Sequence, residues 1–142
     1  MHNDFRLYYS KHAREVYDDN CNGEKKLFPQ KSDMFFWCVA LGYKSSPNQV
    51  PPSIAVSEKG RGEIHWGAFD DEIQKPFLNM VAVECHKDFK VLGSDNYDKF
   101  RDILQAYAEL GFTVLSTHMN GNFEPEKLME ILIESMDIEN AE

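Results

Sequence analysis

The sequence has few cysteines, no long apolar run and no apolar N-terminal segment that resembles a signal peptide. Its three cysteines, Cys21, Cys38 and Cys85, are an odd number without short spacing, so we expect a reduced, cytoplasmic protein rather than a secreted disulfide scaffold. The longest apolar run, Met34 to Leu41, is far shorter than the roughly 20 residues that a membrane-spanning helix needs. We therefore expect a soluble protein without membrane association.

The spacings of a metal centre or a nucleophilic enzyme are also missing. The five histidines are scattered, and no pair of ligands has a C-x-x-C or H-x-x-x-H spacing, so we expect no metal site and no cofactor. Cys85 and His86 are adjacent, and adjacent residues on a helix point about 100° apart, so they cannot act as a nucleophile and its base. The sequence favours a protein that is not an enzyme.

Basic residues are scarce in the second half of the chain. Residues 1 to 66 carry nine Lys and Arg against eight Asp and Glu, whereas residues 67 to 142 carry six against sixteen. Because phosphate binding needs clustered cations, direct nucleic-acid binding is not expected, and any such role must lie in the first half. The acidic face of the last helix, with Glu126, Glu130 and Glu134, is either solvated surface or a docking site for a basic partner.

The first part of the chain has the order strand, helix, helix. Aromatic residues predict a short strand at Phe5 to Tyr9, and Ser10 is a suitable N-cap for a helix over Lys11 to Asn20. Residues 5 to 43 therefore invite comparison with ribbon-helix-helix DNA-binding domains. Since the strand contains Arg6 as its single cation, a small DNA-binding regulator remains an alternative hypothesis rather than the preferred one.

An unusually apolar segment follows, KSDMFFWCVALGYKS. We predict a helix that begins at Ser32 or Asp33 and ends at Gly42, where a left-handed residue is favourable. Apolar side chains nearly encircle it, which is typical of a central, buried helix. If Trp37 or Tyr43 is left uncovered, it would mark a contact with a protein partner or with a second copy of the chain.

The remaining pattern predicts an exposed loop over Ser45–Arg61, a strand over Glu63–Phe69 and three further helices. Gly111 either ends the clearest of these helices or is a weak point in a longer one. Within the loop, the Lys-Gly-Arg-Gly segment 59–62 contains glycines and cations that suit phosphate binding. It lacks a strand before and a helix after, which favours a solvated loop.

Together these segments predict one fold class and one domain. We expect an α+β, mostly α protein, a compact bundle of about five helices with two or three short strands. Residues 1–142 are predicted to form a single domain, with residues 138–142 as a frayed tail.

A second alternative is a Mg²⁺-dependent nuclease. Asp70 or Asp71, followed by Asp88-Phe89-Lys90, has the order of carboxylates and lysine that such enzymes use. The pattern is common by chance in a charged chain, and the helix predicted between the two segments does not suit the hairpin of those enzymes.

Three segments, LFPQKSDMFFWCVALGYKS (27–45), EIHWGAFDDE (63–72) and FRDILQAYAELGFTVL (100–115), resemble the Dnd-system-associated protein four family. These small proteins are encoded beside bacterial genes for DNA phosphorothioation and restriction. The resemblance implies an accessory or regulatory role in antiphage defence, through protein–protein contacts with a component of that DNA modification and restriction system. It carries over no catalytic or ligand residue.

Overall fold

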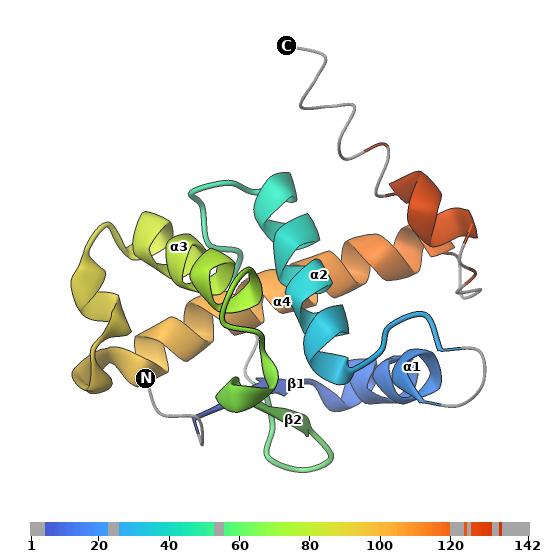
Figure 1. Cartoon of the computed structure of the whole chain (residues 1–142), viewed down its shortest axis with the longest axis horizontal. Coiled ribbons are helices and arrows are strands. Elements are labelled where there is room, and N and C mark those ends of the chain that lie inside the picture. Colours follow the sequence, from blue (N-terminus) through green and yellow to red (C-terminus); the bar gives the residue numbers. More distant parts are fainter. Residues whose placement is uncertain are drawn as a thin grey trace.

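The computed structural model describes residues 5–22, 26–52, 56–119, 124, 126–131 and 134. The fold is mostly helical with one two-stranded antiparallel sheet, which confirms the predicted α+β, mostly α class. Short 3-10 turns at residues 66–68, 89–92 and 94–96 join some of the elements, and helical turns at 126–131 follow the last long helix. The elements in chain order are β1 (Arg6–Tyr9), α1 (Lys11–Cys21), α2 (Lys31–Ser45), β2 (Gly62–His65), α3 (Gln74–His86) and α4 (Tyr97–Met119) (Figure 1).

The sheet pairs β1 with β2 over four residues, from Arg6 opposite His65 to Tyr9 opposite Gly62. Leu7 and Ile64 point inward and are buried, whereas Arg6, Glu63 and His65 are exposed on the outer face. The predicted strand over Glu63–Phe69 is therefore too long. The chain leaves the sheet after His65 in a 3-10 turn over Trp66–Ala68, which places Trp66 in the core.

The edge of β1 that faces away from β2 is bonded to α4. Arg101 Nε donates to the carbonyl of Arg6 (3.0 Å), and the amide of Tyr8 donates to Gln105 Oε1 (2.8 Å). The amide of Ser10 donates to Glu109 Oε1 at 3.2 Å, one helical turn further along α4. Because β1 has hydrogen-bond partners along both edges, it cannot pair with the strand of a second copy as a ribbon-helix-helix dimer requires.

The first two helices begin with different capping arrangements. Ser10 Oγ accepts a hydrogen bond from the amide of Ala13 (3.2 Å), which confirms Ser10 as the N-cap of α1. The N-cap of α2 is Gln30, not Ser32 or Asp33 as predicted. The Asp33 carboxylate accepts from the Gln30 amide (3.0 Å) and forms the reciprocal part of a capping box.

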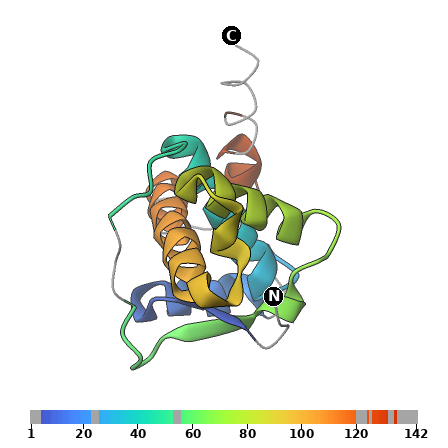
Figure 2. The ribbon, with the colours of Figure 1, turned by 90° about the vertical axis from the view of Figure 1, so that its left-hand side faces the viewer.

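Neither Gly42 nor Gly111 ends its helix. Gly42 lies within α2, which continues to Ser45, and Gly111 lies within an unbroken α4. A Cβ atom on Gly42 would collide with the carbonyl of Tyr107, and one on Gly111 would collide with the carbonyl of Cys38. The two glycines instead let the backbones of α2 and α4 approach closely where they cross, as Figure 1 and Figure 2 show.

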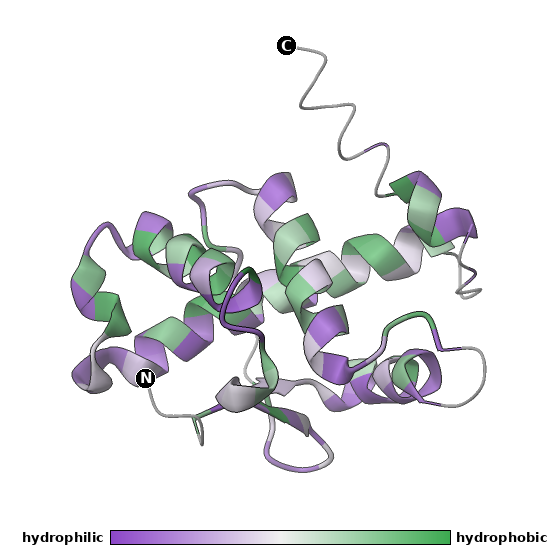
Figure 3. Cartoon of the chain, in the orientation of Figure 1, coloured by the Kyte–Doolittle hydropathy of each residue, from purple (hydrophilic) through white to green (hydrophobic). Residues whose placement is uncertain are grey.

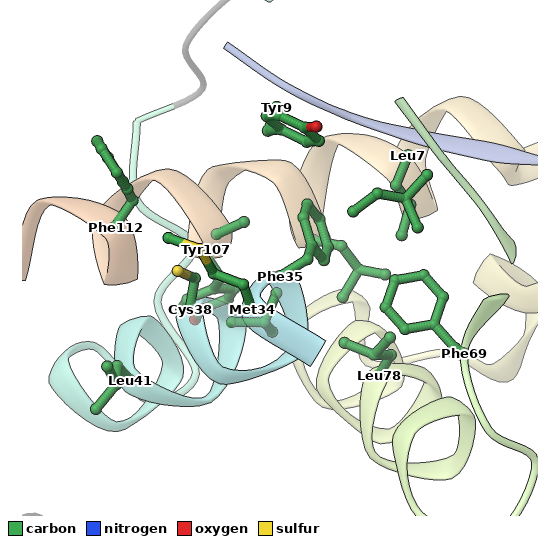
Figure 4. Packing of buried hydrophobic residues seen from close by; sticks show 14 of the residues in the cluster. Leu7, Tyr9, Met34, Phe35, Cys38, Leu41, Phe69, Leu78, Tyr107 and Phe112 are labelled. Carbon is green, nitrogen blue, oxygen red and sulfur yellow. The ribbon is translucent and has the colours of Figure 1, made fainter. Parts of the chain in front are cut away.

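The core lies around this crossing. α2 supplies Met34, Phe35 and Cys38, all fully buried, and they meet side chains from the sheet, α3 and α4. The rings of Phe35 and Phe69 lie edge to face, with their centres 6.0 Å apart. Figure 4 shows these residues together with the buried Leu7, Tyr9, Leu41, Leu78, Tyr107 and Phe112.

The connection between α2 and β2 contains neither helix nor strand at its described positions, 46–52 and 56–61. Residues 47 to 50 are exposed. The tail predicted at residues 138–142 lies outside the described part of the chain. Within the described ranges, each helix is too short or too polar to cross a lipid bilayer.

Candidate interaction surface

Helix α3 has two apolar faces, of which only one is in the core. Leu78, Val81 and Ala82 are fully buried against the rest of the molecule. On the other side of α3, Met80 is 41% exposed and Phe77 is partly exposed, while Ile73, just before the helix, is 66% exposed. These three residues are spaced by four and three positions, so they lie on one side of the segment.

The neighbouring side of α2 continues this apolar area. Trp37 is 38% exposed, and its ring lies edge to face with that of Phe36, with the ring centres 5.6 Å apart. The Phe36 ring in turn lies 5.3 Å from that of Phe77 on α3. Figure 3 shows hydrophobic positions along both helices where they lie next to each other. We name these five residues the α2–α3 surface: Phe36, Trp37, Ile73, Phe77 and Met80.

Tyr43 lies further along α2 and is half-buried. Its ring lies edge to face with that of Tyr107, with centres 5.5 Å apart, and its hydroxyl is 3.4 Å from Asn48 Oδ1. Burial is the main cause that raises the pKa of Tyr43, and the nearby Cys85 and Glu84 on α3 add to it. Of the two aromatic residues proposed from the sequence for a partner contact, Trp37 is thus the more exposed.

Hydrogen bonds fix the N-terminal ends of α2 and α3 beside this surface. Gln74 Nε2 donates to Asp33 Oδ1 (2.8 Å) and connects the two helices. Asp70 Oδ1 accepts from the amides of Glu72, Ile73 and Gln74, which lowers the pKa of Asp70. The backbone around the exposed Ile73 is therefore held in place before any partner binds.

The residues proposed for a nuclease are not brought together. Asp70 and Asp71 precede α3, whereas Asp88 and Lys90 follow it, and a 13-residue helix is about 20 Å long. Asp71 forms an ion pair with Lys75 (2.6 Å), and the carboxylate of Asp88 accepts from the amide of Lys90 (2.8 Å). In the part of the chain that the structure describes, no group of three or more metal-binding side chains occurs.

Cys85 of α3 and Tyr107 of α4 form a pair of titratable groups in contact. Cys85 Sγ lies 3.4 Å from the hydroxyl of Tyr107, which donates to the carbonyl of Ser46 (2.7 Å). Burial, followed by the contact with Cys85, raises the pKa of Tyr107, so the phenol stays protonated. The arrangement joins α3, α4 and the loop after α2.

The acidic face lies elsewhere. Glu126, Glu130 and Glu134 are exposed, on the helical turns near the C-terminal end of α4 and away from α3 (Figure 1). Glu134 also lines a hollow of about 210 Å³. The other residues around the hollow are Leu41, Lys44, Ser45, Val114, His118 and Ile131. Glu134 thus lies near the C-terminal end of α2, which also carries Tyr43, whereas the α2–α3 surface lies where α2 meets α3.

The sequence interpretation missed Ile73 and Met80. A signal for them was present, because α3 carries apolar residues both at 78, 81 and 82 and at 73, 77 and 80. A helix of this length with two apolar faces needs two neighbours to cover them. In the described structure one of these faces is left partly open.

A family model supplies the link to a biological system. The model for DNA sulphur modification system-associated protein 4 matches residues 6–142. The chain belongs to this family. No curated protein and no solved structure gives a significant match to the chain. Family membership confirms the resemblance seen in the sequence and associates the chain with a DNA sulphur modification system.

Proposed function

We propose that this chain is a non-enzymatic accessory protein that binds another protein of its DNA sulphur modification system through the α2–α3 surface. The observation that carries the proposal is the group of exposed apolar side chains on α2 and at α3. The most exposed of them are Ile73, Met80 and Trp37. The family supplies the system in which the partner is sought. In this role the protein acts in the bacterial cytoplasm, as part of a defence system that restricts phage DNA.

The composition and rigidity of the surface suit a protein contact. Aromatic and methionine side chains are enriched at the centres of protein interfaces, and tryptophan is prominent among residues that dominate binding energy. The Phe36 ring connects Trp37 to Phe77, so the aromatic group is already ordered on two helices. A partner with a complementary apolar patch would therefore order few additional side chains on binding.

The test combines the purified full-length protein with each purified protein encoded in the same modification system. Binding is measured by titration calorimetry for the native chain and for an Ile73→Glu, Met80→Glu double variant. Because a charge in the centre of an apolar interface must be desolvated, we expect at least about a thirtyfold loss of affinity. Phe89→Glu is the matched control, since Phe89 is 77% exposed but lies outside the surface.

Two results would contradict the proposal. The first is that no protein of the system binds the native chain, while light scattering shows a monomer. The second is that the double variant binds as tightly as the Phe89→Glu control. A native dimer that the double variant dissociates would instead assign the surface to a second copy of the chain.

A further inference from the structure

The arginines of this acidic protein gather in one place. The chain contains four arginines in all, far apart in the sequence. Arg61 Cζ lies 3.5 Å from the centre of the Tyr8 ring, on the outer face of the sheet, and Arg101 Cζ lies 5.5 Å from the same centre. Arg6 belongs to the same strand as Tyr8, and Arg14 Nη1 donates to the carbonyl of Gly60 next to Arg61 (3.3 Å).

A tight turn before β2 brings lysines to the same group. Gly60 adopts a φ of +78°, a left-handed conformation that favours glycine. A Cβ atom on Gly60 would lie 2.8 Å from Cδ of Lys11, so the aliphatic stem of Lys11 packs against the turn. The turn therefore places Lys59 and Arg61 beside Lys11 and Arg14 of α1. The Lys-Gly-Arg-Gly segment is thus held against a helix rather than extended freely into solvent.

Half of this cationic group has no carboxylate partner. Arg6 pairs with Glu63 (3.3 Å), Arg101 with Asp98 (2.9 Å) and Arg14, more distantly, with Asp18 (3.9 Å). In the described part of the chain, no carboxylate lies within ion-pair distance of three further cations. These are Lys11, Lys59 and Arg61. The nearby Glu15 and Glu58 form no ion pair there either, so the positive charge of the three is available to an anion.

We propose that this group, which we name the arginine cluster, binds the phosphodiester backbone of DNA. It consists of Arg6, Lys11, Arg14, Lys59, Arg61 and Arg101. A guanidinium held over an aromatic ring keeps its planar donors in place, and these donors match phosphate oxygens. A two-stranded ribbon fits the width of the DNA major groove. The outer face of β1 and β2 can therefore approach the groove between the two phosphodiester backbones of the duplex.

Charge distribution favours this face over the rest of the molecule. The acidic turns with Glu126, Glu130 and Glu134 lie near the C-terminal end of α4, away from the sheet (Figure 1). From the sequence, a ribbon-helix-helix mode of DNA binding is not preferred, because β1 carries Arg6 as its single cation. The cluster arises only when α1, the turn at residues 58–60 and α4 meet the sheet. A DNA contact here would leave the α2–α3 surface free for a protein partner.

The experiment measures fluorescence anisotropy of an end-labelled DNA duplex of about 20 base pairs with the full-length protein, from about 20 to about 200 mM NaCl. The cluster has six cations, three of them outside ion pairs, so log K should fall against log salt with a slope between about −3 and about −5. A triple variant, Lys11→Gln, Lys59→Gln and Arg61→Gln, should lose about tenfold or more in affinity at the lowest salt, and its slope should be closer to zero by about 3. Circular dichroism and thermal unfolding verify that the variant is folded.

The matched control removes the same charge elsewhere, by Lys87→Gln, Lys90→Gln and Lys127→Gln. It should bind the duplex within about twofold of the native chain. Equal losses in both triple variants would overturn the proposal, as would absence of duplex binding by the native chain at the lowest salt. A labelled polyglutamate peptide is the second probe. If it binds as tightly as the duplex and loses affinity with the same triple variant, the cluster serves an acidic protein rather than DNA.

Discussion

The two sides of α2 are both apolar, yet they have different surroundings. On the inner side, Met34, Phe35 and Cys38 are fully buried against α4 and the core. On the outer side, Phe36 contacts both Trp37 and Phe77, and Trp37 remains 38% exposed. Hydrophobic content alone therefore does not separate core from binding surface. The difference lies in the neighbouring helix: α4 packs closely against the inner side, whereas α3 covers the outer side only in part.

Glycine is the clearest mark of the inner side. Gly42 on α2 faces the backbone of α4, and Gly111 on α4 faces the backbone of α2. Such mutual small positions permit close packing, which gains dispersion energy over the whole crossing. The outer side has large aromatic rings instead, which stand above the backbone and suit a partner that comes from outside.

The largest effect is expected at the crossing. Gly111→Ala places a methyl group against the carbonyl of Cys38, so α2 and α4 must move apart, and we expect a loss of about 3 kcal/mol in the free energy of unfolding. This loss outweighs the gain of about 1 kcal/mol from replacing glycine within a helix. Urea denaturation measures it. Gly93→Ala is the control, because the added atom would lie 3.3 Å from one carbonyl, that of Lys90. A stabilised Gly111→Ala protein would show that the helices do not cross closely.

The same glycines show what the sequence could and could not predict. Ser10 was identified correctly as a helix cap because capping is a local interaction within four residues. Gly42 and Gly111 match the local signal of a helix end equally well, but their role depends on a helix some 70 residues away in the sequence. Local rules cannot detect such a neighbour, so the end of α2 was placed too early.

The candidate surfaces follow the same logic. Trp37 is a candidate for a partner contact from the sequence because apolar side chains nearly encircle its helix, so that a side left uncovered would be a binding surface. The connection of Trp37 to Phe77 through Phe36, and the inclusion of Ile73 and Met80, depend on how α3 packs beside α2. The arginine cluster could not be predicted for the same reason, since Arg6 and Arg101 are 95 residues apart in the sequence.

A second effect, of about 2 kcal/mol, is expected on the inner side at alkaline pH. Burial raises the pKa of Cys38 from its ordinary 9.0 to about 12. The folded state thus keeps a proton that the unfolded state releases, so the stabilisation is complete below about pH 9 and is lost as the pH rises toward 12. The free energy of unfolding should fall by up to about 1.4 kcal/mol per pH unit from this thiol.

Urea denaturation between about pH 8.5 and 10.5 checks this slope against a Cys38→Ala variant, which lacks the thiol. The stability difference between the two proteins should shrink by about 2 kcal/mol over that range, because only the native chain has the Cys38 contribution. Parallel curves would show that the thiol ionises freely in the folded state. Groups whose raised pKa does not depend on Cys38, such as Tyr107, are present in both proteins and cancel in the comparison.

A smaller effect is expected at Tyr107, where the inner side of α2 meets the loop that follows it. Tyr107→Phe removes the donor to the Ser46 carbonyl and leaves that oxygen without its partner, at a cost of about 1 to 2 kcal/mol. Tyr43→Phe is the matched control, because the Tyr43 hydroxyl is on the partly exposed side and has only a long contact of 3.4 Å to Asn48. Thermal unfolding should separate the two variants. Equal stabilities would mean that the Tyr107 hydroxyl is solvated as well.

The smallest effect on stability is expected on the α2–α3 surface. Ile73→Ser changes a side chain that is 66% exposed, so the free energy of unfolding should shift by no more than about 0.5 kcal/mol. The same change at Ile103, which is 4% exposed, should cost about 3 kcal/mol or more because it leaves a cavity and buries a hydroxyl. Urea denaturation of both variants compares the two environments directly. If Ile73→Ser is as destabilising as Ile103→Ser, then the α2–α3 surface belongs to the core of the isolated chain, and it is no longer a surface that a partner can cover.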